Sequence, residues 1–161
     1  MLLPAAGVVA AILAWWLLAA VLAPVSLAGV APHVALALAA LLPSAALLAV
    51  MILAQMGARA MTGAIDPLAG TDSPFLRTNQ RVIANTVEQM TVFVPALLAL
   101  AAGVPAARMG PVVALAYVFA VARLVFWIGY LAGVRLRAPG MAATFAVNVA
   151  TLAAAAWVWL T

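Results

Sequence analysis

The sequence predicts an all-α fold, an integral membrane bundle of helices, and two observations lead to this fold class. The chain of 161 residues is 70% hydrophobic and 6% charged, with a mean hydropathy of +1.30, whereas soluble domains are roughly 45–50% apolar and about 25% charged. Its apolar residues form five runs of near-spanning length, separated by segments rich in Pro, Gly and Arg. A chain this short cannot bury that much apolar surface in one water-soluble core, so a lipid bilayer must surround it.

The first apolar run, residues 5–23, matches the roughly 20 residues that a spanning helix needs and is closed by Pro24. A cleaved signal peptide is the alternative, but no Lys or Arg precedes the run, and signal peptides begin with positive charge. We therefore expect an extra N-terminal transmembrane helix and its loop over residues 1–33. A membrane domain of four helices is expected over residues 34–161.

The remaining four runs predict the helices of that domain. The second run, residues 34–58, contains Pro43, at which we expect a kink. A polar loop follows, and Asp72-Ser73-Pro74 predicts the cap and first turn of the next helix. The other three helices are expected over residues 75–102, 112–134 and 141–160.

The arginines predict the orientation in the membrane. Seven arginines and no lysine carry the positive charge, and five of them lie at the two junctions that follow the second and fourth runs. These five are Arg59, Arg77, Arg81, Arg135 and Arg137. Alternating spans place both junctions on one side, and the positive-inside rule assigns that side to the cytoplasm. We therefore expect a multi-pass protein of a bacterial inner membrane with a cytoplasmic N-terminus.

The composition argues against several kinds of site. Cysteine is absent and His33 is the only histidine, so we expect no disulfide, no metal site and no Ser-His-Asp triad. The arginines are scattered singly and form no basic stripe, which argues against binding of nucleic acid.

Polar residues concentrate on one face of the third predicted helix, where the sequence places Arg77, Arg81, Asn85 and Glu88. At about 100° per residue, these four side chains fall within an arc of roughly 80°. Charged groups within a span are costly and mark function or a compensating partner. This face must therefore lie against the bundle or a subunit interface.

The fourth predicted helix carries a second such face, formed by Arg123, Phe126, Tyr130 and Arg137 if the helix continues to Arg137. At about 100° per residue, these side chains fall within roughly 60° of one another. Because Arg123 and Glu88 lie at comparable depths on antiparallel helices, we predict an ion pair between them, within a subunit or across an interface. The alternative is that these two residues only lock the helices in register.

The arginines Arg77, Arg81, Arg135 and Arg137 surround the mouth of the expected pocket and outnumber its single carboxylate. This surplus of guanidinium groups suits a small polyanion, either an anionic lipid headgroup or a peptide with several carboxylates.

These residues resemble a known family over about residues 35–160. Arg77-x3-Arg81-x3-Asn85-x2-Glu88 resembles the signature of the membrane-associated proteins in eicosanoid and glutathione metabolism, the MAPEG family. Ala122-Arg123-Leu124-x4-Gly129-Tyr130, followed by Leu136-Arg137, is similar to a later helix of its transferases and synthases. The resemblance implies a homotrimer of four-helix subunits that holds glutathione between neighbouring subunits on the cytoplasmic side.

The resemblance also implies residue roles. The expected glutathione-binding residues are Arg77, Arg81, Asn85, Glu88, Arg123 and Tyr130. Arg137 matches the arginine that activates the glutathione thiol, since a guanidinium near sulfur lowers the pKa of the thiol.

The function implied is that of a membrane-embedded glutathione-dependent transferase or peroxidase, which conjugates or reduces lipophilic electrophiles that arrive from the bilayer. The alternative is a non-catalytic membrane scaffold or lipid-binding trimer. Phe126 and Gln89 stand where the synthases have tyrosines, and Ile83 lacks the amide of its counterpart. A transporter or channel is less favoured because the polar residues stop halfway through the span.

Overall fold

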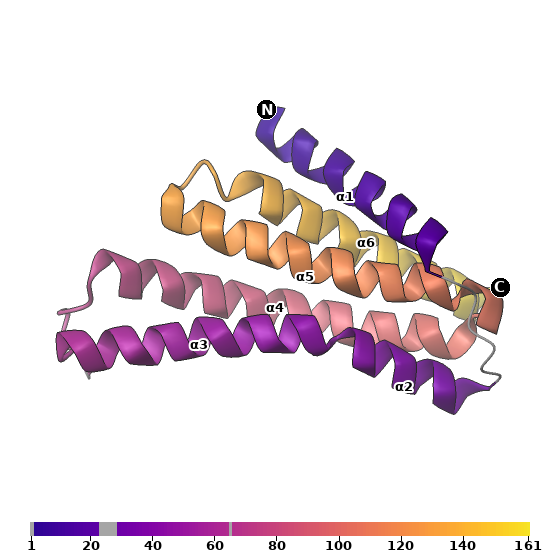
Figure 1. Cartoon of the computed structure of the whole chain (residues 1–161), viewed down its shortest axis with the longest axis horizontal. Coiled ribbons are helices and arrows are strands. Elements are labelled where there is room, and N and C mark those ends of the chain that lie inside the picture. Colours follow the sequence, from indigo (N-terminus) through magenta and orange to yellow (C-terminus); the bar gives the residue numbers. More distant parts are fainter. Residues whose placement is uncertain (1, 23–28, 65) are drawn as a thin grey trace.

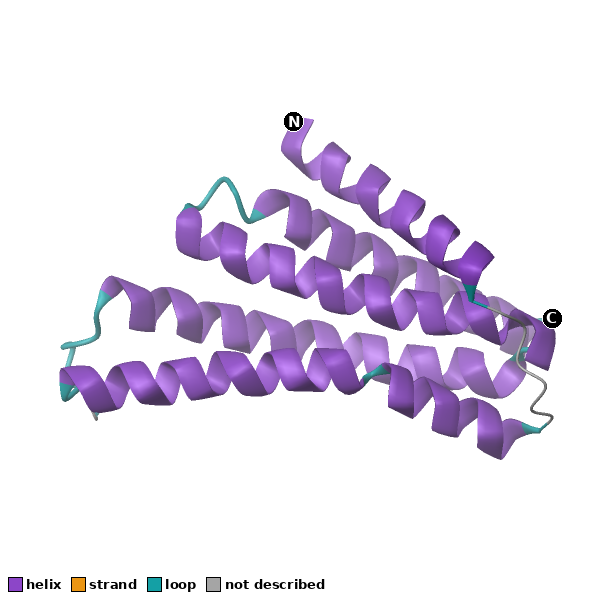
Figure 2. Ribbon diagram, in the orientation of Figure 1, coloured by secondary structure: helices purple, strands orange, loops and turns teal. Residues whose placement is uncertain are grey.

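In a computed structural model of the chain, the structure describes residues 2–22, 29–64 and 66–161, and every regular element within them is helical (Figure 2). The elements are α1 (Leu2–Val21), α2 (Val30–Ala40), α3 (Leu42–Thr62), α4 (Pro74–Gly103), the short η1 (Ala106–Arg108), α5 (Met109–Ala132) and α6 (Ala138–Leu160). Five helical stretches are long and apolar enough to cross a membrane, with α2 and α3 counted as one. The predicted helical membrane bundle is confirmed.

The kink expected at Pro43 is present as a break between α2 and α3. The two helices meet at Leu41, whose N–H still bonds to the carbonyl of Ala37 at 3.1 Å. Proline has no N–H for a carbonyl in the preceding turn, so the hydrogen-bond ladder is interrupted there. The two pieces nevertheless form one span from Val30 to Thr62.

The start of α4 follows the predicted cap. Ser73 has extended backbone angles, and its hydroxyl oxygen accepts a hydrogen bond from the N–H of Leu76 at 3.2 Å. Pro74 occupies the first turn, where its missing N–H costs nothing. At the end of α3, Gly63 adopts a left-handed conformation with φ of 68° and stops that helix.

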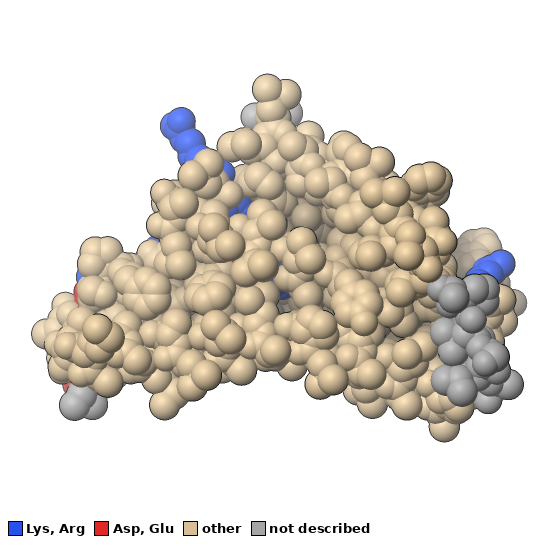
Figure 3. All heavy atoms as spheres, in the orientation of Figure 1, with Lys and Arg blue, Asp and Glu red and all other residues tan. Residues whose placement is uncertain are grey.

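The helices pack with both arginine-rich junctions at one end of the bundle (Figure 1). α4 packs against α2, α3, α5 and α6, while α1 packs on the outer side against α5 and α6. Figure 3 shows one face of the molecule, and few charged side chains are visible on it between the two ends of the bundle. This distribution is typical of a surface that lies in hydrocarbon.

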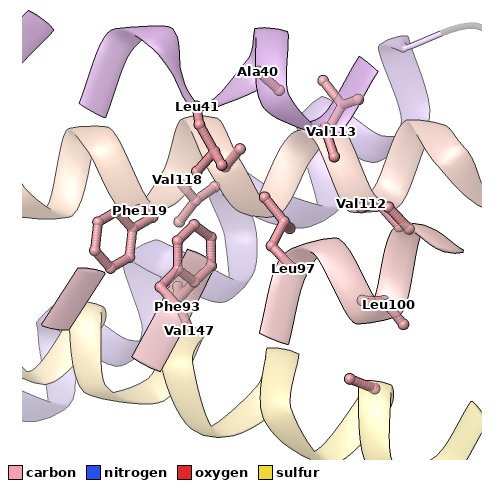
Figure 4. Packing of buried hydrophobic residues seen from close by; sticks show 14 of the residues in the cluster. Ala40, Leu41, Phe93, Leu97, Leu100, Val112, Val113, Val118, Phe119 and Val147 are labelled. Atoms are coloured by element: carbon pink, nitrogen blue, oxygen red, sulfur yellow. The ribbon is translucent and has the colours of Figure 1, made fainter. Parts of the chain in front are cut away.

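The core lies among α2, α4, α5 and α6 (Figure 4). At its centre, the rings of Phe93 and Phe119 stack with centroids 4.1 Å apart and an interplanar angle of 3°. Leu97 and Val147 are buried beside this pair. This packing joins α4 to α5 and α6, and it begins on α4 directly after the polar residues of its first half.

α1 is attached to the bundle by close contacts at both ends. A Cβ atom at Gly7 would come within 2.1 Å of the carbonyl oxygen of Pro139, at the start of α6. A Cβ atom at Gly110 would come within 2.8 Å of the carbonyl oxygen of Leu22. Between these contacts, the indole N–H of Trp15 donates to the carbonyl of Pro111 at 3.1 Å.

The close approach at Gly7 predicts the effect of a larger side chain there. Because Gly7→Val drives its Cβ into the backbone of Pro139, we expect a loss of about 1–3 kcal/mol of stability, typical of overpacking. The measurement is unfolding by denaturing detergent in mixed micelles. Gly57→Val is the matched control, since nothing lies within 4 Å of a Cβ at Gly57. Equal stabilities for the two variants would contradict the packing of α1.

Candidate functional site

A cavity of about 580 Å³ lies at the arginine-rich end, between α4, α5 and the starts of α6 and α1. Four of the predicted site residues line it: Arg81 and Asn85 from α4, Tyr130 from α5, and Arg137 from the turn before α6. The rest of its wall is largely apolar and consists of Pro4, Phe126, Ala138, Met141, Ala142 and Phe145. The structure therefore brings together polar residues that lie far apart in the chain.

Helix geometry explains the two pairs on α4 and α5. Arg81 and Asn85 are one helical turn apart, as are Phe126 and Tyr130, so each pair points the same way. The rings of Phe126 and Tyr130 meet edge to face, with centroids 5.7 Å apart. This contact holds the phenol of Tyr130 against an apolar wall.

Arg137 reaches the cavity by a route that differs from the prediction. Arg137 would share a face with Arg123 and Tyr130 only if the helix expected over residues 112–134 continued to it, but α5 ends at Ala132 and a turn follows. The turn returns the chain, and the guanidinium carbon of Arg137 lies 4.5 Å from the centre of the Tyr130 ring. A cation over an aromatic face is an attractive arrangement.

Two glycines allow this turn to fold tightly against α5. A Cβ at Gly129 would lie 2.3 Å from the carbonyl oxygen of Leu136, and a Cβ at Gly140 would lie 2.3 Å from the backbone nitrogen of Phe126. Any larger residue would push the turn outward and carry Arg137 with it.

Arg123 is buried behind the cavity and does not line it, with 1% of its surface exposed. Its Nη1 donates to the side-chain oxygen of Asn85 at 3.1 Å, and its Nη2 donates to the hydroxyl of Thr86 at 2.7 Å. Its guanidinium carbon also lies 4.1 Å from the centre of the Phe126 ring. The hydrogen bond from Arg123 thus fixes the orientation of the Asn85 amide.

Within the chain, the predicted ion pair between Arg123 and Glu88 is not formed. Asn85 stands between the predicted partners: its oxygen accepts from Arg123, and its amide nitrogen donates to Glu88 at 3.4 Å. An amide therefore links the cation to the carboxylate, and a pair across a subunit interface stays a prediction.

Two other predicted residues lie outside this cavity. Glu88 is exposed on α4, and Arg77 is exposed near the start of the same helix. The guanidinium of Arg77 donates to the carbonyl of Asp72.

A buried polar network near the start of α4 was not predicted. Asn79 is fully buried, and its amide nitrogen donates to the carbonyl of Met51 at 2.9 Å and to the side-chain oxygen of Gln55 at 3.0 Å. The indole N–H of Trp127 donates to the oxygen of Asn79 at 2.8 Å. Gln55 in turn donates to the carbonyl of Leu76. The only signal in the sequence is the polar character of the first half of α4.

A further polar contact ties α6 to α4. The amide nitrogen of Asn148 donates to the side-chain oxygen of Gln89 at 2.6 Å. Asn148 therefore makes a bond between helices and does not line the cavity.

The family comparison agrees with this geometry. The family model described as "MAPEG family" matches residues 30–157, most of the chain. The chain belongs to the MAPEG family. No curated protein matches it. The matched range begins at the first residue of α2, so α1 lies outside the part that this MAPEG chain shares with the family model.

The network around Asn79 predicts a large effect of its removal. In Asn79→Ala, the indole N–H of the half-buried Trp127 and the side-chain oxygen of the buried Gln55 lose their partner, so we expect a loss of about 1–3 kcal/mol of stability. Unfolding by denaturing detergent measures it. Thr91→Ala, on the exposed side of α4, is the control. The control should change stability by less than about 0.5 kcal/mol. A loss in Asn79→Ala no greater than in the control would show that the network does not stabilise the bundle.

Proposed function

We propose that this MAPEG protein binds glutathione, or a similar small thiol, in the cavity of about 580 Å³, and uses it as a transferase or peroxidase on lipophilic electrophiles. The observation that carries the proposal is the meeting of Arg81, Asn85, Tyr130 and Arg137 in that one cavity. Membership of the family supports the use of glutathione, because the family is generally one of glutathione metabolism.

The charges of glutathione fit those of the site. The tripeptide carries two carboxylates and one ammonium group, and guanidinium groups form strong bidentate bonds with carboxylates. Arg81 supplies such a group on the cavity wall, and Asn85 supplies an amide. We assign the ammonium group to Glu88. This carboxylate does not line the cavity in the single chain, but it accepts a hydrogen bond from Asn85, which does.

Arg137 has the position of a residue that activates sulfur. A guanidinium close to a thiol favours the thiolate, lowers the pKa of the thiol and raises the concentration of the nucleophile at neutral pH. The chain contains no cysteine, so the sulfur must come from the bound thiol. In the transferase reaction, this thiolate attacks an electrophilic carbon, and a sulfur–carbon bond replaces the bond to the leaving group.

The apolar part of the wall suits an electrophile from the membrane. Phe126, Met141, Ala142 and Phe145 line the side of the cavity formed by α5 and α6. Phe145 is also 61% exposed on the outer surface of the bundle, where lipid lies. An apolar substrate can therefore approach the sulfur without crossing water.

We further propose that the active form is a homotrimer with its arginine-rich end in the cytoplasm. Glu88 lies about eleven residues, or about 16 Å, along α4 from Arg77. Its side chain is exposed in the single chain. Exposure of a carboxylate to hydrocarbon at that depth has a high free-energy cost. A neighbouring subunit against α4 would cover it and complete the cavity.

The role of Arg137 is tested by titrating the ultraviolet absorbance of thiolate in purified protein mixed with glutathione. We expect the pKa of the bound thiol to lie below the value of about 8.5 for an ordinary thiol. In Arg137→Ala this pKa should rise toward that value, because the nearby positive charge is removed.

Arg135→Ala is the matched control, since Arg135 is an exposed arginine of the same turn and does not line the cavity. It should keep the low thiol pKa. An unchanged pKa in Arg137→Ala would refute the assigned role. Glutathione binding by the wild-type protein without any thiolate signal would favour the non-catalytic scaffold.

The role of Glu88 is tested with a glutathione analogue that lacks the α-amino group. Loss of one charge-assisted hydrogen bond should weaken binding to the wild-type protein by about tenfold or more. Glu88→Gln should bind the two ligands about equally, as measured by titration calorimetry.

Asp66→Asn, in the exposed segment between α3 and α4, is the control and should keep the preference for glutathione. If Glu88→Gln kept it too, the ammonium group would have to bind elsewhere.

A further inference from the structure

A second cavity, of about 520 Å³, lies beside the first at the arginine-rich end. It is formed by the end of α3, the segment that follows and the start of α4. Its lining residues are Arg59, Pro67, Asp72, Arg77, Gln80 and Arg81. Arg81 lines both cavities, so one guanidinium stands between them.

The second cavity has a surplus of positive charge. Arg59 and Asp72 neutralise each other through two hydrogen bonds of 2.9 and 3.1 Å, and Arg59 also donates to the carbonyl of Ala64 at 2.8 Å. Neither Arg77 nor Arg81 forms an ion pair within the described part of the chain. Two positive charges are therefore left without a carboxylate at the rim.

The position of Arg77 is fixed by the chain itself. Its Nη1 donates to the carbonyl of Asp72, and Asp72 is in turn held by Arg59. Arg77 is exposed and lines the cavity together with Gln80 of the same helix, and its other N–H groups have no hydrogen-bond acceptor in the described part of the chain. These groups are donors without acceptors, which suits a phosphate with several charged oxygens.

The level of the second cavity in the membrane favours a lipid ligand over a free ion. It lies at the start of α4, where a spanning helix leaves the hydrocarbon and meets the headgroups. Met56 and Ile52, three and seven positions before Arg59, share its side of α3. These two residues are 61% and 40% exposed, respectively. An apolar surface for acyl chains thus runs down from the cavity.

We propose that this cavity binds the phosphate of an anionic phospholipid, held by Arg77 and Arg81 with Gln80, while the acyl chains lie along the exposed side of α3. Guanidinium groups at the membrane surface attract anionic headgroups. The site shares Arg81 with the thiol cavity, whereas Arg77 and Gln80 line only the second cavity. Lipid binding requires no reaction in the thiol cavity.

Native mass spectrometry of protein extracted from mixed vesicles of phosphatidylglycerol and phosphatidylcholine tests the proposal. We expect retained phosphatidylglycerol on the wild-type protein and at least about a fivefold loss in Arg77→Gln, the equivalent of about 1 kcal/mol. Gln80→Glu, which adds a negative charge to the rim, should reduce binding in the same direction. Both residues are exposed, so the variants should fold.

Arg108→Gln is the matched control, because Arg108 is an exposed arginine in η1, between the end of α4 and the start of α5, and so lies at the opposite end of α4 from Arg77. It should retain phosphatidylglycerol as the wild type does. Equal losses in Arg77→Gln and Arg108→Gln would show attraction to net charge alone and would overturn the site. Displacement of the lipid by inorganic phosphate at equal concentration would assign the cavity to a free anion and overturn the lipid.

Discussion

The arrangement of the polar residues depends on one buried guanidinium, that of Arg123. It lies within the bundle without a carboxylate partner in the described part of the chain and is held by Asn85, Thr86 and the ring of Phe126. Its Nε has no hydrogen-bond partner in the described structure. A charge within a span costs at least about 2.5–3.5 kcal/mol, so helices α4 and α5 must stay in the register that satisfies it. That register is also the one that places Asn85 and Phe126 on the wall of the cavity.

A second set of bonds enforces the same register nearer the start of α4. Asn79 joins α3 to α5 through Met51, Gln55 and Trp127, and it lies on the same helix as Asn85, nearer its start. Because hydrocarbon offers no alternative partners, side-chain bonds between spans are kept once they form. α4 is therefore fixed between two polar contacts, and its arginines reach the cavity rim from a rigid helix.

Hydropathy and helical periodicity predict most of the fold but only part of the site. The spans follow from length and composition, and Ser73 and Pro43 mark a cap and a break that both occur. Arg137 could not be placed this way, because it depends on a turn folded against Gly129 and not on a continued helix. The Asn79 network was missed because its partners lie on other helices. The angle of a residue on its own helix does not specify which neighbour it meets.

The extra helix α1 adds a constraint that the family match does not contain. It packs on α5 and α6 through small residues, and its contact at Gly7 lies on Pro139, two positions after Arg137. Pro4 lines the cavity itself. Since α1 covers the far side of α5 and α6, the polar face of α4 with Glu88 stays uncovered in the single chain. Helix α1 can therefore support the turn that carries Arg137, while it leaves α4 free to meet another subunit.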